Sequence, residues 1–356
     1  MAEIFSKLLD KIKTNKELKE SGKVTSIAFP FSRLNEHFPG WERSTQTIIT
    51  ASSGIGKTKL AKFLTITNTF NFIKQHPEIE YKVFYFALEE SKDNFWLGMI
   101  STMLYEKYGI ELSPTQLKSL GKFTITNDVF SKVEECRETI EEMTKYIEVV
   151  DFIFNPFGIF RYVKTWFDNP ENGEYEFDNN TNEKVTKRYN YKNPNLWVFV
   201  VTDHIGLLSP ENGENQHACI SRYSKDYCLK KFTKLYQCCT ILIQQQAASQ
   251  EQQQYTNQGQ SIEEKLEPSL DGLGINKNTQ QEADMVLGLF APHRYNLARH
   301  RGYDIKRMGN KYRSCRILKD RNNGLDGKYI PLYFNGATNT FKELDKATEI
   351  DYDLIT

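Results

Sequence analysis

Short apolar runs alternate with longer segments of helical periodicity along most of the chain. The apolar runs, each predicted to be a buried strand, cover residues 47–51, 81–88, 146–154, 197–202, 240–244, 285–290, 315–318 and 329–334. Apolar residues recur at helical spacing over 57–74, 95–105, 113–143 and 216–236. Strands that alternate with helices form parallel sheets with helices on both faces. The pattern therefore predicts an α/β domain with a mainly parallel central sheet.

Two segments interrupt this alternation. Residues 166–194 are rich in Asn, Glu, Lys and Tyr, with alternation across Asn172-Gly173 and Asn179-Asn180. They are predicted to form a surface β-hairpin inserted between core strands. Residues 246–281 are rich in Gln, contain Gly and Pro, and have little apolar periodicity. A connection of this length is either functional or disordered.

Both ends of the chain carry features of their own. Residues 2–20 are charged apart from a helical stripe made by Ile4, Phe5, Leu8, Leu9 and Ile12. This helix either packs on its own domain or is an arm that docks on a neighbouring subunit, and the sequence leaves both open. The acidic segment 345–356 is a solvated terminus or, alternatively, a binding site for a basic primase or loader protein.

Composition narrows the class of protein. Apolar residues make up 39%, enough for a sizeable core. Lys plus Arg and Asp plus Glu both number 46, so a nucleic-acid partner has to be met by a local basic patch. The longest apolar run, 196–201, is far shorter than the roughly 20 residues of a membrane span. The N-terminus has no signal-peptide core, and the 6 cysteines include no CxxC pair. We therefore expect a soluble cytoplasmic protein with neither membrane segment, disulfide framework nor structural zinc.

The strongest chemical signal is a P-loop between a predicted strand and a predicted helix. Its residues are Ala51, Ser52, Ser53, Gly54, Ile55, Gly56, Lys57 and Thr58, with Ala in the first glycine position. Glycines let the backbone N–H groups converge on phosphate oxygens, and the helix N-terminus adds partial positive charge. Lys57 is then expected to reach the β- and γ-phosphates of ATP, and the Thr58 hydroxyl to ligate Mg²⁺.

Three further strand ends are expected to supply the remaining groups. The apolar run that begins at Leu196 closes on Asp203, a Walker B acid for Mg²⁺. Glu89 follows the run 83–88 and is the predicted general base, with the alternative that it caps the next helix. Gln245 follows another apolar run and could sense the γ-phosphate, although three consecutive glutamines leave the register uncertain by one.

Basic residues concentrate towards the C-terminus. They are Arg294, Arg299, Arg301, Lys306, Arg307, Lys311, Arg313, Arg316, Lys319 and Arg321. This basic tract either faces phosphate, of DNA or of nucleotide, or is a solvated surface. Lys319 and Arg321 are two residues apart, so on a strand they share a face, which suits an arginine finger that acts in trans.

The order of these motifs resembles the DnaB-type replicative helicases, and most of all their phage members. The resemblance rests on residues 31–35 (FSRLN), the P-loop, 86–91 (FALEES), 198–208 (VFVVTDHIGLL), 241–246 (ILIQQQ), 281–284 (QEAD) and 319–322 (KDRN). It covers about residues 25–344 and implies a RecA-like ATPase domain, with 1–24 as the linker helix, 166–194 as an insertion and 345–356 as a tail.

The resemblance also implies an activity. Family members form rings, usually hexamers, that close around single-stranded DNA and move along it by hydrolysing ATP between subunits. Lys57, Thr58, Asp203 and Glu89 would come from one subunit, and Lys319 with Arg321 from its neighbour. Loops 206–216 and 246–281 would face the channel and hold the DNA backbone.

Some family features have no counterpart here. We find no N-terminal collar domain in the sequence, and no basic residue soon after Gln245. The arginine that family members carry after the loop's proline is Gly274. Backbone N–H groups would then have to contact the DNA phosphates. Two other activities fit the same motifs: a recombinase-like filament on single-stranded DNA, and an accessory protein whose nucleotide only controls assembly.

Overall fold

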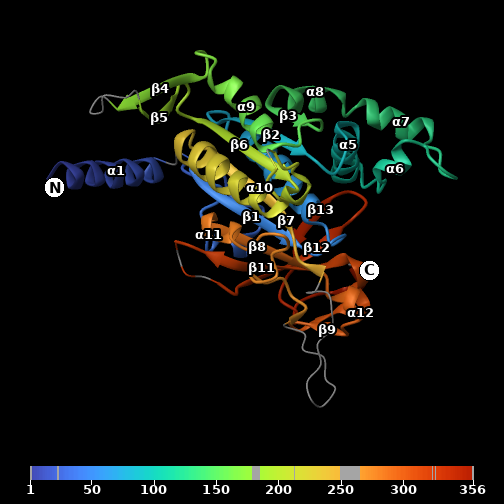
Figure 1. Cartoon of the computed structure of the whole chain (residues 1–356). Helices are drawn as coiled ribbons and strands as arrows, with labels where there is room; N and C mark the ends of the chain where they lie inside the picture. The colour runs from blue at the N-terminus through green and yellow to red at the C-terminus, as the bar shows by residue number, and fades with distance from the viewer. Residues whose placement is uncertain are drawn as a thin grey trace.

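The computed structural model describes residues 2–21, 24–178, 185–211, 213–248, 265–322, 324 and 326–354. Within these residues, a nine-stranded sheet runs through the centre of the protein in the order β13-β12-β11-β8-β1-β7-β6-β2-β3 (Figure 1). Its strands are β1 Thr45–Ala51, β2 Glu80–Ala87, β3 Ile147–Val150, β6 Leu196–Asp203, β7 Cys239–Gln245, β8 Met285–Phe290, β11 Tyr312–Asp320, β12 Tyr329–Asn335 and β13 Thr340–Glu343. The strands from β8 to β3 are parallel to their neighbours, whereas β11, β12 and β13 pair antiparallel. The prediction of a mainly parallel α/β sheet is confirmed.

Helices cover both faces of this sheet. Besides the N-terminal helix, the described α-helices are α2 Ser32–Asn35, α3 Lys57–Lys62, α4 Asn68–Gln75, α5 Lys92–Tyr108, α6 Pro114–Leu117, α7 Asn127–Glu134, α8 Arg137–Tyr146, α9 Pro156–Phe167, α10 Gln216–Arg222, α11 Thr279–Glu282 and α12 Ile305–Met308. A π-helical turn, Phe63–Thr67, joins α3 to α4, and a second π-helical segment, Tyr223–Leu235, continues α10.

Alternate residues of each strand enter two separate cores. On β1, Ile49 packs in the core that also contains Leu60 of α3 and Phe95 of α5. Its neighbour Ile48 packs in the opposite core, with Ile159 of α9. Successive strand side chains point to opposite faces, so continuous apolar runs are the pattern expected of strands buried on both sides.

The inserted hairpin consists of β4 Gly173–Asp178 and β5 Val185–Tyr191. Tyr189 of β5 is fully buried, with its ring edge against Phe167 at 4.9 Å, and Phe167 stacks on Tyr236 at 4.0 Å. Aromatic packing therefore anchors the hairpin on the sheet face that carries α9. The expected turn at Asn179-Asn180 lies outside the described residues.

The observed elements differ from the expected ones in three places. The strand predicted over 146–154 ends at Val150, and helix α9, which was not predicted, begins soon afterwards. Asn155 caps α9 by accepting a hydrogen bond from Gly158 N, and Pro156 occupies its first turn. Strand β13 and the short pair β9 Arg299–His300 and β10 Tyr303–Asp304 were also not predicted.

The two ends differ in how they pack. Helix α1, Ala2–Glu20, extends away from the sheet, and its stripe residues Phe5, Leu8, Leu9 and Ile12 are exposed (Figure 1). The acidic tail instead lies against β10: Tyr303 donates to the Asp345 carbonyl at 2.7 Å, and Asp304 N donates to the Tyr352 hydroxyl at 2.9 Å. Among the described helices, none has the length and apolar character needed to span a bilayer.

Candidate nucleotide site

Four parallel strands bring the predicted site residues to one edge of the sheet. Ala51 at the end of β1 pairs with Gln245 at the end of β7, and Ala87 at the end of β2 pairs with Asp203 at the end of β6. Glu89 follows β2 by two residues. The carboxyl ends of adjacent parallel strands are where open α/β sheets bind ligands.

The P-loop has the backbone conformation of an anion cradle. Gly54 and Gly56 have φ values of +74° and +112°, a region that disfavours side chains. A Cβ on Gly56 would also lie 3.1 Å from Cζ of Phe334. Helix α3 begins directly after this glycine, and Lys57 is only 5% exposed. The loop thus places a helix N-terminus and a lysine at one point, which fits a phosphate group.

Asp203 is buried and lies beside the first turn of α3, the helix that follows this loop. Thr58 Oγ1 donates to its Oδ1 at 3.1 Å, and the Tyr85 hydroxyl donates to its Oδ2 at 2.8 Å. Burial raises the pKa of the Asp203 carboxyl to about 6, against the lowering effect of these two hydrogen bonds. Tyr85 was not among the expected site residues, although it lies on β2 on the same face as Ala87.

The donor set fits Mg²⁺ bound together with a nucleotide. A hydroxyl and a carboxylate are hard oxygen ligands, and Thr58 and Asp203 already lie within hydrogen-bond distance. The described residues contain no group of three or more His, Cys, Asp or Glu that could hold a metal ion. Magnesium usually keeps waters and phosphate oxygens as its other ligands, so two protein ligands are sufficient.

The two glutamates after β2 have different partners. Glu90 forms an ion pair with Lys62, whose ammonium lies 4.6 Å from the Phe95 ring centroid. Glu89 is about half exposed, and its Oε2 lies 3.8 Å from Nε2 of His204, the residue after Asp203. Ser91 caps α5 by accepting a hydrogen bond from Asn94 N. The capping role is therefore filled without Glu89.

The structure also distinguishes the three glutamines. Gln244 is buried; its amide donates to the carbonyls of Gly274 and Asn276. Gln246 is buried and donates to the Thr50 hydroxyl at 3.0 Å. Successive side chains of a strand point to opposite faces of the sheet, so Gln245 lies on the face opposite to Gln244. That face also carries Ile243 and the helix that follows the P-loop. Gln245 is thus the one whose side chain is turned towards the P-loop side.

Lys319 and Arg321 lie at the opposite edge of the sheet. Arg321 Nη1 donates to Asp284 Oδ1 at 3.0 Å, and Asp284 contacts Gln46 near the start of β1. Lys319 Nζ donates to the Gln280 carbonyl at 2.5 Å. The 7 residues of β1 separate this edge from the P-loop by about 20 Å. These cations therefore cannot reach a nucleotide in their own P-loop.

Much of the basic tract is paired inside the chain. Glu267, which is buried, accepts hydrogen bonds from Arg301 and Arg316. Arg307 pairs with Asp353 and Arg321 with Asp284. Arg294 and Arg313 donate to P-loop carbonyls. Several of these cations are thus engaged within the chain, and the two alternatives for the tract, contact with phosphate or a solvated surface, stay predictions.

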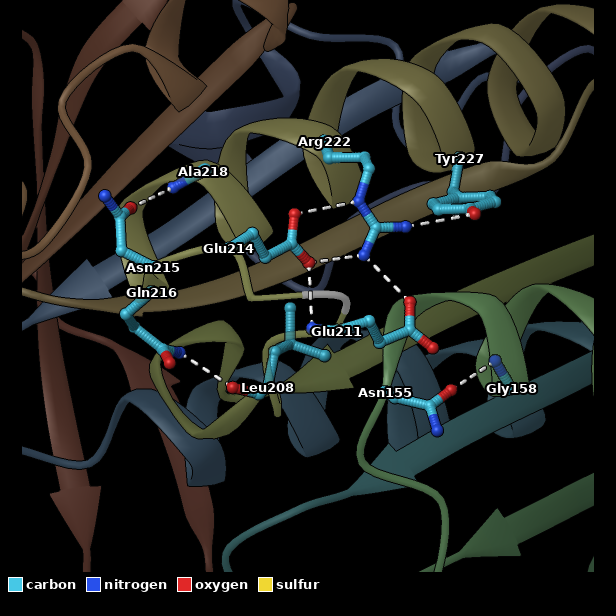
Figure 2. A network of polar contacts seen from close by, with 10 residues as sticks. All are labelled: Asn155, Gly158, Leu208, Glu211, Glu214, Asn215, Gln216, Ala218, Arg222 and Tyr227. Atoms are coloured by element: carbon cyan, nitrogen blue, oxygen red, sulfur yellow. Dashed lines mark hydrogen bonds and ion pairs between the residues drawn. The ribbon is translucent and has the colours of Figure 1, made fainter.

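The loop after β6 is held by a polar network, seen from close by in Figure 2. Arg222 of α10 lies between Glu211 and Glu214, with Nη2 2.8 Å from Glu211 Oε2 (Figure 2). Gln216 donates to the Gly206 and Leu208 carbonyls at 3.1 and 2.8 Å. The described residues of this loop are therefore held by the loop's own contacts, and a single arginine pairs with both of its acidic side chains.

The loop after β7 is described at its two ends, 246–248 and 265–281. Gly274 N donates to the Gln245 carbonyl at 2.9 Å, and a Cβ at Gly274 would lie 2.8 Å from that oxygen. An arginine in this position would require the backbone to move. The absence of the expected arginine thus has a steric reason in this chain.

Comparisons with solved structures bear on the fold of the chain. The chain is similar to a structure described as a DnaB-like replicative helicase and its interactions with primase, with a TM-score of 0.67, 19% identity, and coverage of 96% of this chain and 71% of that one. It is also similar to the ATPase domain of G40P, with a TM-score of 0.68, 19% identity, and coverage of 94% and 98%. No family model and no curated protein matches the sequence. The predicted RecA-like fold of DnaB-type helicases is thereby confirmed.

Proposed function

We propose that the protein is a replicative DNA helicase of the DnaB type, which assembles as a hexameric ring around single-stranded DNA and moves by hydrolysing ATP between subunits. The observation that carries this proposal is the separation of the site into two halves. The P-loop, Asp203 and Glu89 lie at one edge of the sheet, and Lys319 and Arg321 lie at the other, about 20 Å away along β1. Two neighbouring copies would complete each other's sites.

In this proposal, Lys57 and the N–H groups of the P-loop bind the β- and γ-phosphates of ATP. Thr58 and Asp203 hold Mg²⁺, which screens the charge of the phosphates when bound. Tyr85 keeps the Asp203 carboxylate oriented towards Thr58.

Glu89 is the proposed general base. Its carboxylate is half exposed beside the site and lies near His204, so it is free to accept a proton from the attacking water. Gln245, on the P-loop side of β7, is the proposed γ-phosphate sensor. It directly precedes loop 246–281, and its carbonyl accepts from Gly274 N of that loop, so a change at its side chain would be passed to the loop.

Assembly is proposed to use α1. Its exposed apolar stripe is the kind of surface that a helix buries against a partner, and the helix stands away from its own sheet. DNA would be held at loops 206–216 and 246–281, mainly through backbone N–H groups. A primase or loader protein is a further proposed partner.

The test is ATP hydrolysis with and without single-stranded DNA, with Lys57→Ala as the blank. We expect strong stimulation by DNA that disappears in the variant. Hydrolysis that is indifferent to DNA would favour the accessory role in which nucleotide only controls assembly. Stimulated hydrolysis accompanied by open helical filaments in electron micrographs would favour the recombinase-like alternative.

A further inference from the structure

Two arginines of the basic tract contact the P-loop from its rear side. Arg313, near the start of β11, donates from Nε to the Ile55 carbonyl at 2.8 Å. Arg294, in the short 3₁₀ helix after β8, donates from Nη1 to the Ser53 carbonyl. Neither contact involves a nucleotide directly, and neither residue belongs to the P-loop motif.

The two acceptor carbonyls belong to the peptide units that end in the P-loop glycines. The Ser53 carbonyl shares its peptide with the Gly54 N–H, and the Ile55 carbonyl shares its peptide with the Gly56 N–H. In a trans peptide the C=O and N–H point in opposite directions. A donor that holds the carbonyl at the rear therefore aims the N–H of the glycine towards the front, where a phosphate would bind.

These glycine peptides need an external restraint. Gly54 and Gly56 adopt positive φ values, and glycine has wide conformational freedom, so the peptide planes on either side can rotate. A loop that presents its N–H groups only part of the time binds an anion more weakly, because the ordering cost is paid on binding. Fixing the carbonyls beforehand removes part of that cost.

Arg313 is built into the fold as a rigid restraint. It is 2% exposed, and its other N–H groups donate to the carbonyls of Asn310 and Tyr312, each at 2.8 Å, and to Asn310 Oδ1 at 2.9 Å. Its guanidinium lies 4.3 Å from the centroid of the Phe334 ring. That ring is also the group that a Cβ at Gly56 would meet. Burial lowers the pKa of Arg313 to about 9, so the side chain is still charged at neutral pH.

Arg294 provides the second restraint in a different environment. It is exposed, and its Nη1 lies 3.8 Å from the position that a Cβ on Gly54 would take. Arg294 is therefore the residue at which the effect on the loop can be separated from an effect on folding.

We propose that Arg313 and Arg294 are positioning residues that pre-organise the P-loop, holding the Ile55 and Ser53 carbonyls so that the Gly56 and Gly54 N–H groups face the phosphates of a bound nucleoside di- or triphosphate. The inference rests on the proposed nucleotide binding, but not on helicase activity. Part of the basic tract would then promote nucleotide binding without contacting the nucleotide.

The experiment measures the Kd of a fluorescent ADP analogue for the full chain and four variants. Arg294→Gln replaces the guanidinium donor to Ser53 by a shorter, neutral amide, Arg294→Lys keeps a charged donor, and Arg313→Lys keeps the charge but cannot serve four acceptors. Arg299→Gln is the matched control, because Arg299 is exposed and belongs to the same tract on β9. The melting temperature of each nucleotide-free protein is measured in parallel.

We expect Arg294→Gln to raise the Kd about three- to tenfold, which is the size of a lost charge-assisted hydrogen bond at an exposed site. Its nucleotide-free melting temperature should equal that of the unchanged protein. Arg294→Lys should recover most of the affinity, Arg313→Lys should lose about tenfold, and Arg299→Gln should have no effect.

An unchanged Kd in Arg294→Gln would overturn the inference, whatever Arg313→Lys does. An equal loss in Arg299→Gln would overturn it too, because the effect would then be one of overall charge. Absence of nucleotide binding in the unchanged protein would overturn both this inference and the proposed function. Binding that responds as expected, in a protein that separates no DNA strands, would remove only the helicase proposal.

Discussion

Replacing Tyr85 by Phe removes one hydroxyl and should shift the pH dependence of ATP hydrolysis. The hydroxyl donates to Asp203 Oδ2 at 2.8 Å, and both side chains are fully buried. Burial raises the pKa of Tyr85 well above its ordinary value, so the hydroxyl remains a donor at every pH of interest. The hydrogen bond stabilises the ionised form of Asp203, which is the form that can hold Mg²⁺.

The magnitude follows from the strength of that bond. A hydrogen bond to a buried charged group contributes about 1.5–3 kcal/mol, and one pKa unit corresponds to about 1.4 kcal/mol. The pKa of Asp203, about 6 in the unchanged protein, should therefore rise by about 1–2 units in Tyr85→Phe. At pH 7 the ionised fraction would fall about two- to tenfold, and at about pH 9 it would again exceed about nine-tenths.

The assay is kcat/KM for ATP against pH, which reports the groups of the free enzyme. We expect a rising limb centred near pH 6 in the unchanged protein and about 1–2 units higher in Tyr85→Phe. Tyr81→Phe is the matched control, because Tyr81 lies on the same strand, is 2% exposed, and has a hydroxyl with no hydrogen-bond partner among the described residues. Identical midpoints in the unchanged protein and Tyr85→Phe, or an equal shift in Tyr81→Phe, would refute the reasoning.

Three further predictions follow from other parts of the structure. Burial raises the pKa of Asp203 from 3.8 to about 6, so above pH 6 its ionised form lowers the free energy of unfolding of the nucleotide-free protein by about 3 kcal/mol. Asp203→Asn should therefore raise the melting temperature at pH 8 but not below about pH 4, and it should abolish ATP hydrolysis. A lower melting temperature of this variant at pH 8 would contradict the prediction. If Arg321 acts in trans, Lys57→Ala and Arg321→Ala, each inactive alone, should regain ATP hydrolysis when their subunits are mixed, and no recovery would contradict a shared site. Replacing the exposed Phe5 and Ile12 by Glu should convert rings to smaller species in light scattering without changing the melting temperature, whereas an unchanged mass would rule out α1 as an assembly element.

The parts of the fold that were predictable are those with strong local patterns. The continuous apolar run of β6 and the strand, P-loop and helix around Gly56 need no distant contact to be recognised. Helix α9 was missed although Asn155-Pro156 is a good start signal, because the apolar residues before it extended the predicted strand. Strand β13 is only 4 residues long, too short for a periodicity to appear.

The residues of the candidate site also fall into those that a local pattern predicts and those that it does not. Motif residues such as Lys57 and Asp203 are adjacent to patterns that identify them, and parallel strands bring them to one edge. Tyr85 and Arg313 act through partners 118 and 258 residues away, so nothing local marks them. The basic tract illustrates the limit of charge counting, since the sequence shows its charge but not that Arg301 and Arg316 both turn towards the buried Glu267.

Strand separation on a forked DNA duplex tests the central claim most directly. We expect the protein to release the displaced strand when ATP and Mg²⁺ are present, and Lys57→Ala to release none. ATP hydrolysis that is stimulated by single-stranded DNA but separates no strands, with the protein loaded before or after ring assembly, would contradict the proposal of a helicase.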